Sequence, residues 1–387
     1  MMSEEKMTPK LRFSGFDEKW HQSKFEDIYD IKNGLNKGKE YFGNGIQILN
    51  YMDVNKYELN TEKTIEGLVE LSDEEIERFS VKPNDLFFTR TSETSDEIGL
   101  TSAYVGNPVK CVFSGFLLRA RPKIDLNSLF FAYYLRSPKQ RNNIIKFSSI
   151  TTRALISGGN LSKMKINIPP IEEQNKIANL FVILDKKVTL LEKKYQKYQD
   201  FKKYLMQQIF TQKLRFNFEV IKLKDLSKIN KGKQLNKDDM IDDGEFYVLN
   251  GGQEPSGYTN EWNTPENTIT ISEGGNSCGF VNFNEEKFWS GGHCYYLSEL
   301  SSKLDDYYLF SYLKFIEPKI MRLRVGSGLP NIQKGDIENI KVKITDINEQ
   351  YKISSILKST DNCISSINAQ KHNFEIFKKG LLQQMFV

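Results

Sequence analysis

Apolar residues recur at heptad spacing in two separate stretches of the chain. In the first stretch they follow steps of four and three residues, with Lys202 in one slot: Leu184, Val188, Leu191, Tyr195, Tyr198, Leu205 and Ile209. The second stretch keeps this spacing with Leu357, Ile364, Ile367, Phe374, Leu381 and Met385. Such spacing is typical of a coiled-coil seam and predicts two long helices. A continuous helix from Glu173 to Phe210 would be about 55 Å long at about 1.5 Å per residue.

Both stretches belong to an internal repeat. Residues 168–177 read Ile-Pro-Pro-Ile-Glu-Glu-Gln-Asn-Lys-Ile, and residues 344–353 read Ile-Thr-Asp-Ile-Asn-Glu-Gln-Tyr-Lys-Ile, an offset of 176 positions. The offset continues without a gap and also aligns Asp185 with Asp361. Residues 25–34 resemble residues 223–232, and both lead into glycine-rich sequence. Self-similarity of this extent indicates a duplicated unit, in which a globular domain is followed by a helix.

The globular parts mix strand-like and helix-like segments. Residues 85–89 and 268–272 have the composition of buried strands, and residues 274–276 and 290–292 that of turns. Short helices are expected near 129–135 and 307–313. The fold class is therefore α+β. We expect a first globular domain at 1–167, a helical spacer at 168–216, a second globular domain at 217–343 and a C-terminal helical spacer at 344–387.

The two helix starts differ in sequence. Pro169 and Pro170 stand just before the first helix, where a missing backbone donor costs little. The second copy has Thr345 and Asp346 instead, so we expect a looser start there.

The order of the segments constrains their arrangement. The second domain lies between the two helices in the sequence, and the two ends of a domain usually lie close together. The helices are therefore expected to run antiparallel, with one domain at each end, an approximate twofold axis and adjacent chain termini. If both domains bind DNA, a separation of about 34 to 36 Å would place them on successive turns of one duplex. Because the domains differ in sequence, the target would be bipartite and not palindromic.

Two alternatives concern the helices. Each helix could pack only on its own domain, although a seam of about four heptads is longer than a typical globular helix requires. The lysines between the seam positions fit a solvated outer face, and tracking of DNA phosphates is the other reading. These lysines are Lys186, Lys187, Lys193, Lys194 and Lys197.

Composition supports at least two globular domains. The 387 residues exceed the roughly 250 to 300 at which one hydrophobic core stops growing. No apolar run approaches the roughly 20 residues of a membrane span, and the polar N-terminal stretch lacks the features of a secretory signal. We therefore expect a cytoplasmic protein with no membrane partner. A formal charge of +4 is compatible with nucleic-acid binding but does not demand it.

Several catalytic chemistries lack their motifs. The four cysteines form no Cys-x-x-Cys pair, and the neighbours His293 and Cys294 are better explained as packed residues than as half a metal site. The segment 167–171, Asn-Ile-Pro-Pro-Ile, lacks the aromatic residue of an adenine methyltransferase loop and fits a helix entry instead. No Gly-x-x-x-x-Gly-Lys-Ser/Thr phosphate loop is present. The acidic runs at 73–75 and 242–243 fit surface positions better than a nuclease metal site.

The repeat and its flanking motifs resemble the specificity subunit of type I restriction-modification systems over essentially the whole chain. The marks are the repeated Glu-Gln (173–174 and 349–350), the opening Lys-Leu-Arg-Phe-Ser-Gly-Phe (10–16) with Trp20, and Gly-Leu-Pro-Asn-Ile (328–332). The resemblance implies a non-catalytic subunit that reads double-stranded DNA and binds two modification (methyltransferase) subunits, and through them restriction/translocase subunits. It implies no cofactor in this chain; S-adenosylmethionine, ATP and Mg would belong to the partners. A coiled-coil structural adaptor without sequence-specific DNA binding is the alternative.

Candidate DNA-facing residues are polar side chains in loops between strand-like runs, since Arg, Lys, Asn and Gln reach base edges. Any of them could equally be solvated or contact phosphates. They are Thr89, Arg90, Thr91, Ser149, Thr151, Thr152 and Arg153 in the first domain, and Lys233, Asn250, Gln253, Asn276, Arg322, Arg324 and Asn331 in the second. Candidate partner contacts are Glu173, Gln174, Gln207, Gln208, Glu349, Gln350, Gln383 and Gln384, for which helix capping and helix packing are equally good explanations.

Overall fold

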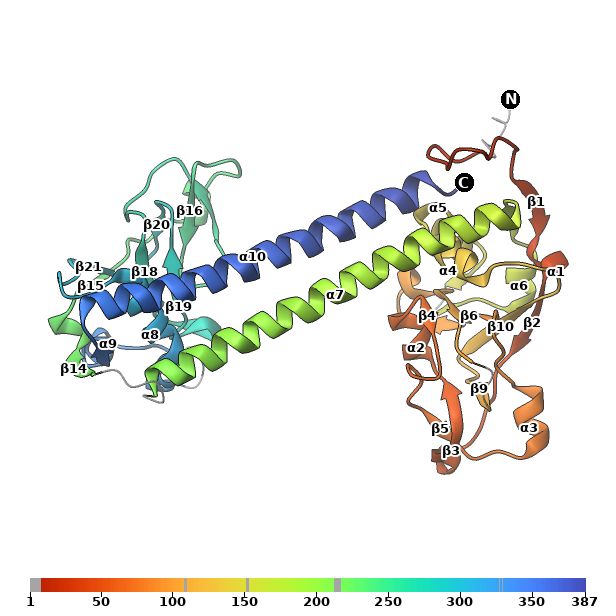
Figure 1. The fold of residues 1–387 in the computed structure, drawn as a ribbon, viewed down its shortest axis with the longest axis horizontal. Helices are drawn as coiled ribbons and strands as arrows, with labels where there is room; N and C mark the ends of the chain where they lie inside the picture. Colours follow the sequence, from red (N-terminus) through yellow and green to blue (C-terminus); the bar gives the residue numbers. More distant parts are fainter. Residues whose placement is uncertain (1–7, 108–109, 151–152, 212–216, 327, 329) are drawn as a thin grey trace. The chain divides into compact units, whose positions relative to one another are not determined.

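The structure, a computed structural model, describes residues 8–107, 110–150, 153–211, 217–326, 328 and 330–387 (Figure 1). It divides into two compact units. The first unit comprises Met1–Leu190 and Lys371–Val387, and the second comprises Leu191–Gln370. In the described residues, no helix combines the length and apolarity needed to cross a membrane.

The first unit is built around a five-stranded sheet in the order β2-β10-β6-β8-β4. Its strands are β2 (Tyr29–Asn33), β10 (Leu117–Pro122), β6 (Leu86–Thr89), β8 (Thr101–Tyr104) and β4 (Leu59–Asn60). Smaller sheets pair β1 (His21–Lys24) with β13 (Lys165–Ile168), β3 (Phe42–Leu49) with β5 (Leu68–Val69) and β9 (Cys111–Phe113), and β12 (Ala154–Leu155) with β7 (Thr91–Ser92) and β11 (Ser149–Ile150). The helices are α1 (Phe25–Ile28), α2 (Tyr51–Lys56), α3 (Asp73–Arg78), α4 (Ser128–Arg136), α5 (Pro138–Lys146) and α6 (Gly158–Ser162), with short 3-10 turns η1 (Lys39–Tyr41) and η2 (Ser95–Glu97).

The second unit has a four-stranded sheet in the order β15-β21-β18-β19. Its strands are β15 (Lys228–Lys231), β21 (Cys294–Ser298), β18 (Thr268–Ser272) and β19 (Val281–Asn284). A three-stranded sheet has the order β17 (Gly257–Thr259), β16 (Phe246–Leu249) and β20 (Trp289–Ser290). A two-stranded sheet pairs β14 (Glu219–Lys222) with β22 (Lys341–Ile344). The remaining elements are α8 (Asp306–Ile320), α9 (Lys334–Glu338), η3 (Leu223–Asp225), η4 (Lys237–Asp239), η5 (Gly275–Ser277) and η6 (Met321–Leu323).

The two domains share one plan. In the first, β10 lies between β2 and β6, and in the second β21 lies between β15 and β18, with antiparallel pairing throughout. Each of the repeated segments 25–34 and 223–232 ends in a glycine, and these two glycines explain part of the similarity between the domains. A Cβ on Gly34 would lie 2.1 Å from the carbonyl oxygen of Ser114, and one on Gly232 would lie 2.2 Å from that of Gly291. Both positions therefore require close backbone approach that only glycine allows.

Two long helices, α7 (Ile171–Phe210) and α10 (Ile347–Gln384), each contribute to both units (Figure 1). In the first unit Phe181 stacks on Phe386 at 5.5 Å, and Lys187 lies over the ring of Phe374. Residue numbers rise along α7 as they fall along α10, so the helices pair antiparallel there. In the second unit Lys202 of α7 bonds Asp361 of α10 at 2.6 Å.

The predicted α+β class with long helices packed together is confirmed. The predicted seam residues are buried or half-buried, with Leu191 and Leu357 among the most enclosed. The alternative in which each helix packs only on its own domain is wrong, because α7 and α10 contact each other within each unit. The five lysines between the seam positions are exposed.

The two helix starts are braced in the same way. Gln174 donates from Nε2 to the carbonyl oxygen of Pro169 at 2.9 Å, and Gln350 donates to that of Thr345 at 2.7 Å. Asp346 accepts from the backbone N–H of Asn348 at 2.9 Å, which caps the second helix. At the second helix start an acidic cap thus stands where the first helix has a proline.

Candidate nucleic-acid interface

Three neighbouring strands of the first domain end or begin at one edge of the main sheet. Asn33 at the end of β2 pairs with Leu118, and Thr89 at the end of β6 pairs with Leu117 at the start of β10. We name this the strand-end edge of the first domain. The corresponding edge of the second domain lies where Lys231 pairs with Tyr295 and Ser272 pairs with Cys294.

Three predicted residues of the first domain meet beside its strand-end edge. Leu155 of β12 pairs with Thr91 of β7 and with Ser149 of β11, and Arg153 directly precedes β12. Thr91 and Arg153 line a hollow of about 460 Å³. Arg153 is 69% exposed and its Nη2 lies 3.6 Å from Glu93. The structure thus unites residues that lie some 60 positions apart in the sequence.

The other first-domain candidates occupy different positions. Thr89 is fully buried, where its hydroxyl donates to the carbonyl oxygen of Glu97 at 2.6 Å and accepts from the N–H of Leu100 at 2.9 Å. It supports the loop beyond β6 and does not reach the surface. Arg90 is half-buried, with Nη1 3.5 Å from the carbonyl oxygen of Gly115. Thr151 and Thr152 lie outside the described residues.

The second domain brings its candidates to the corresponding edge. Asn331 forms backbone bridges with Gly274 and with Val325, which places it between the loop of Asn276 and the segment of Arg324. Asn276, on η5, and Arg324 are exposed. The Oδ1 atom of Asn331 is buried without a hydrogen-bond partner in the described part of the chain. Arg322, on η6, is also exposed.

The remaining candidates of the second domain flank β20. Trp289 donates from Nε1 to the carbonyl oxygen of Lys233 at 2.8 Å, and the Lys233 ammonium lies 5.8 Å from the centre of that ring. Asn250 accepts from the N–H of His293 at 3.4 Å. Gln253 is exposed.

A buried carboxylate organises the strand-end edge of the second domain. Glu273 accepts from Lys231 at 2.6 Å and from the hydroxyl of Tyr295 at 3.0 Å. Burial and this hydrogen bond raise the pKa of Tyr295 to about 12. Nδ1 of His293 lies 3.6 Å from the same carboxylate. Lys231 is thereby held at the edge with its charge partly balanced.

Of the neighbours His293 and Cys294, only Cys294 is buried, whereas the His293 side chain is 64% exposed. His293 is directed to Glu273, whereas the Cys294 thiol donates to the carbonyl oxygen of Tyr295 at 3.6 Å. Burial raises the pKa of Cys294 to about 11, which keeps it a thiol at neutral pH. The interpretation as packed residues therefore holds for Cys294 and is wrong for His293.

The candidate partner residues divide into two groups. Glu173 is buried against Arg12 at 2.7 Å, and the Oε1 atoms of Gln174 and Gln350 accept backbone N–H bonds from Asn127 at 2.9 Å and Asp305 at 3.0 Å. Glu349 is half-buried and accepts from the hydroxyl of Thr345. These four side chains brace the helix starts. The others lie near the helix ends: Gln207, Gln383 and Gln384 are exposed and Gln208 is half-buried.

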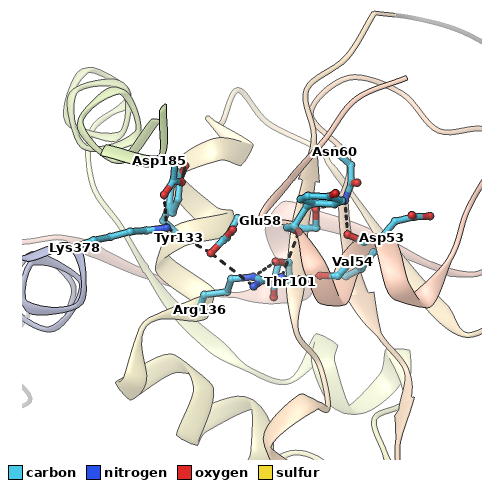
Figure 2. A network of polar contacts seen from close by, with 11 residues as sticks. Asp53, Val54, Glu58, Asn60, Thr101, Tyr133, Arg136, Asp185 and Lys378 are labelled. Carbon is cyan, nitrogen blue, oxygen red and sulfur yellow. Dashed lines mark hydrogen bonds and ion pairs between the residues drawn. The ribbon is translucent and has the colours of Figure 1, made fainter. Parts of the chain in front are cut away.

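A polar network joins the helices to the first domain (Figure 2). Asp185 of α7 accepts from the hydroxyl of Tyr133 in α4 at 2.6 Å and from Lys378 of α10. Lys378 also lies 3.5 Å from Glu58, which is 3.8 Å from Arg136. Arg136 in turn donates to the carbonyl oxygens of Thr101 in β8 and of Val54 in α2, both at 2.6 Å. The second unit has an equivalent of the Asp185 contacts: Asp361 accepts from Lys202 and from the hydroxyl of Tyr307.

Sequence reasoning missed several residues of the strand-end edges. Phe116 is 62% exposed beside Arg153, and Tyr51 and Glu97 line the same hollow. None is an Arg, Lys, Asn or Gln, the types by which candidates were chosen. The glycine turn at 115 immediately before Phe116 was the available signal, because turns between buried strands present their side chains at sheet edges.

Two solved structures have the same fold. A crystal structure of the type I restriction-modification system S subunit from M. genitalium matches with a TM-score of 0.70 and 18% identity, covering 98% of this chain and 99% of that one. The second match is a chain from a structure described as the structural basis of complex assembly and conformational transition of the type I R-M system. Its TM-score is 0.56 at 12% identity, and the match covers 97% of this chain and 99% of that one. The fold is thus that of type I specificity subunits.

The sequence comparisons identify the family. The model of the type I restriction modification DNA specificity domain matches twice, at residues 17–199 and 216–375. A protein of Methanocaldococcus jannaschii named type I restriction enzyme MjaX specificity subunit is 26% identical over 411 aligned positions, which cover 96% of this chain and 94% of that one. A type I specificity subunit of Mycoplasma pneumoniae is 33% identical over 145 positions, or 37% and 38% of the two chains. The chain belongs to the type I restriction-modification DNA specificity family, which is non-catalytic.

Proposed function

We propose that the chain reads a bipartite, asymmetric DNA target, with one half-site recognised at the strand-end edge of each domain. One observation carries this proposal: candidate residues from separate parts of the sequence gather beside the strand-end edge in both domains. Thr91 and Arg153 do so in the first, and Asn276, Arg324 and Asn331 do so in the second. The proposed domain limits remain 1–167 and 217–343, with helical spacers at 168–216 and 344–387.

The proposed partners are two modification (methyltransferase) subunits, one per half of the chain, and through them restriction/translocase subunits. The repeat supports a two-to-one assembly. Phe201 and Phe377 occupy equivalent repeat positions and are 51% and 54% exposed on their helices. An exposed aromatic side chain on each half is suited to burial in an interface. The exposed Gln207, Gln383 and Gln384 extend these surfaces.

The chemistry would belong to the partners. S-adenosylmethionine for adenine methylation, and ATP and Mg for translocation and cleavage, are assigned to the modification and restriction subunits. The chain itself supplies sequence selection and the spacing of the half-sites. A chromosomal DNA target and modification partners would place its action in the cytoplasm.

The proposal is tested by genome-wide methylation mapping in a host that carries this chain and its modification subunits. Arg153→Ala should relax one position of the first half-site, and Arg324→Ala one position of the second. Loss of a good base contact should reduce discrimination about 5-fold to 100-fold. If both variants methylate the wild-type motif unchanged, the assignment of these edges to DNA is wrong. A coiled-coil adaptor predicts no defined motif even for the wild-type chain.

A further inference from the structure

The hollow beside the strand-end edge of the first domain is assembled from separate elements. Tyr51 comes from α2, Thr91 and Ser92 from β7, Glu97 from η2 and Phe116 from the turn before β10. Arg153 and Glu93 complete its rim. Its volume is about 460 Å³.

Glu97 is held in a fixed position in this hollow. Its Oε2 accepts from the hydroxyl of Tyr51 at 3.1 Å and from that of Ser92 at 3.4 Å. Burial, together with the neighbouring Glu97 charge, raises the pKa of Tyr51, so its hydroxyl stays protonated and able to donate. Among the residues that the structure describes, the other carboxylate oxygen, Oε1, accepts no such hydrogen bond. Oε1 therefore remains available as an acceptor, and the two bonds to Oε2 fix the position of the carboxylate.

The backbone that carries Glu97 is fixed on both sides. Arg141 of α5 donates to the carbonyl oxygens of Asp96 at 3.0 Å and Ile98 at 2.5 Å. The buried Thr89 donates to the carbonyl oxygen of Glu97 itself at 2.6 Å. A side chain anchored this way loses little freedom on binding, which is the condition for specific hydrogen bonding.

The charge of the hollow argues against a phosphate. Glu93 and Glu97 contribute two carboxylates, and Arg153 contributes one cation already 3.6 Å from Glu93. A phosphate would be repelled, whereas an exocyclic amino group needs an acceptor of this kind. Cytosine N4 and adenine N6 present such amino groups in the major groove. The exposed ring of Phe116 adds an apolar wall of the type that contacts base edges.

We propose that Glu97 is a specificity-determining residue that accepts a hydrogen bond from the exocyclic amino group of a cytosine or adenine in the first half-site. The inference deepens the proposed function and rests on it, because it assumes that the strand-end edge faces DNA. Tyr51 and Ser92 are positioning residues that hold the carboxylate. Phe116 flanks the same base.

The second domain carries different chemistry at the corresponding loop. Gly99 donates to the carbonyl oxygen of Thr89, and Gly279 donates to that of Ser272, with φ values of +62° and +88°. The loops therefore turn alike after equivalent strands. Where η2 has Asp96 and Glu97, η5 has Asn276 and Ser277, which both donate and accept. The η2 and η5 loops thus have similar backbones but different side chains, so the two domains should recognise different bases.

The first test maps methylation for Glu97→Gln, with Glu70→Gln as the matched control. Glu70 is exposed in the same domain, follows β5 and does not line the hollow. Glu97→Gln should broaden one cytosine or adenine position of the first half-site and lower its discrimination about 10-fold to 100-fold. Glu70→Gln, the second half-site and the spacer should stay unchanged. Complete loss of methylation would overturn the proposal, since one base contact sets discrimination and not assembly.

The second test removes the amino group from the DNA. Binding of the complete complex is measured on duplexes of the mapped motif in which purine replaces adenine, or 2-pyrimidinone replaces cytosine, at the affected position. The wild-type complex should bind the altered duplex about 10-fold more weakly, and Glu97→Ala should show no further loss on it. Additive losses would overturn the inference.

The failures are distinguishable. If Arg153→Ala changes the first half-site while Glu97→Gln does not, the domain reads DNA without Glu97, and only this inference fails. If the wild-type complex methylates no defined motif, the proposed function fails together with it. Tyr51→Phe guards against an ambiguous result, because it removes one hydrogen bond to Oε2 without changing charge and should shift discrimination in the same direction by a smaller factor.

Discussion

Glu58 shows how single charges join the helices to the first domain. Burial alone would raise its pKa, but the positive charges of Lys378 and Arg136 outweigh burial and lower it. A carboxylate whose pKa is lowered on folding stabilises the protein above its unfolded value, near 4.5, and loses this contribution as the pH falls through the folded value. The contact therefore acts at neutral pH and fades in acid.

We expect Glu58→Gln to lower the stability of the first unit by about 1 kcal/mol at pH 7, since the pair is partly exposed. At a pH well below 4.5 the difference in unfolding temperature between the variant and the wild type should be smaller, because the wild-type carboxylate becomes protonated as the pH falls through its lowered folded pKa. Thermal unfolding at both pH values measures this, with Glu70→Gln as the control. An equal deficit at both values would show that the charge is not the cause.

The sequence identified some site residues and missed others for physical reasons. Arg153 and Thr91 were predicted by residue type, and the structure places both at one hollow. Thr89 has a suitable type but is buried beneath the loop. Glu97 was missed because an acidic residue is not expected to face DNA, and only the structure shows that it lines the same hollow as Arg153.

At the scale of elements, long periodic segments were predictable and short ones were not. The heptad spacing predicted α7 and α10, and the buried runs predicted β6 and β18. The strands β7, β11 and β12 have two residues each, too few for any period to appear, yet they position the hollow. The alignment of Asp185 with Asp361 was visible in the repeat. That each aspartate bonds a lysine of the other helix follows only from antiparallel packing.

The helix pair offers a test of the proposed spacing role. One heptad inserted near Lys194 in α7, matched by one near Gln370 in α10, should preserve the seam and lengthen each helix by about 10 Å. At about 3.4 Å per base pair, the unread spacer of the target should change by up to about three base pairs, with some rotation about the duplex. Both half-sites should keep their sequence in methylation mapping.

Exchange of residues 217–343 for another recognition domain is the complementary control. It should alter one half-site and leave the spacer unchanged. An altered half-site in the lengthened chain would contradict the spacing role, whereas unchanged spacing would mean that the helices do not set it.

At the scale of the whole molecule, each domain core contains an aromatic residue from the C-terminal end of a long helix or from just beyond it. The first core includes Phe386, which lies 5.6 Å from Phe130 and 5.7 Å from Tyr134. The second includes Phe210, which lies 5.3 Å from Tyr312. The repeat explains this, because Phe210 and Phe386 are equivalent positions.

The positions of these two residues in the sequence predict the order in which the domains fold during synthesis on the ribosome. Phe210 is synthesised before the domain that it completes, whereas Phe386 emerges only after the entire second domain. We therefore expect the N-terminal domain, although made first, to finish folding last, because its core includes a residue some 250 positions downstream of Phe130. Pulse proteolysis of ribosome-stalled chains should find this domain readily cut until residues 381–387 are out of the exit tunnel. Phe386→Ala should prolong that susceptibility in the released chain, and Phe210→Ala should not.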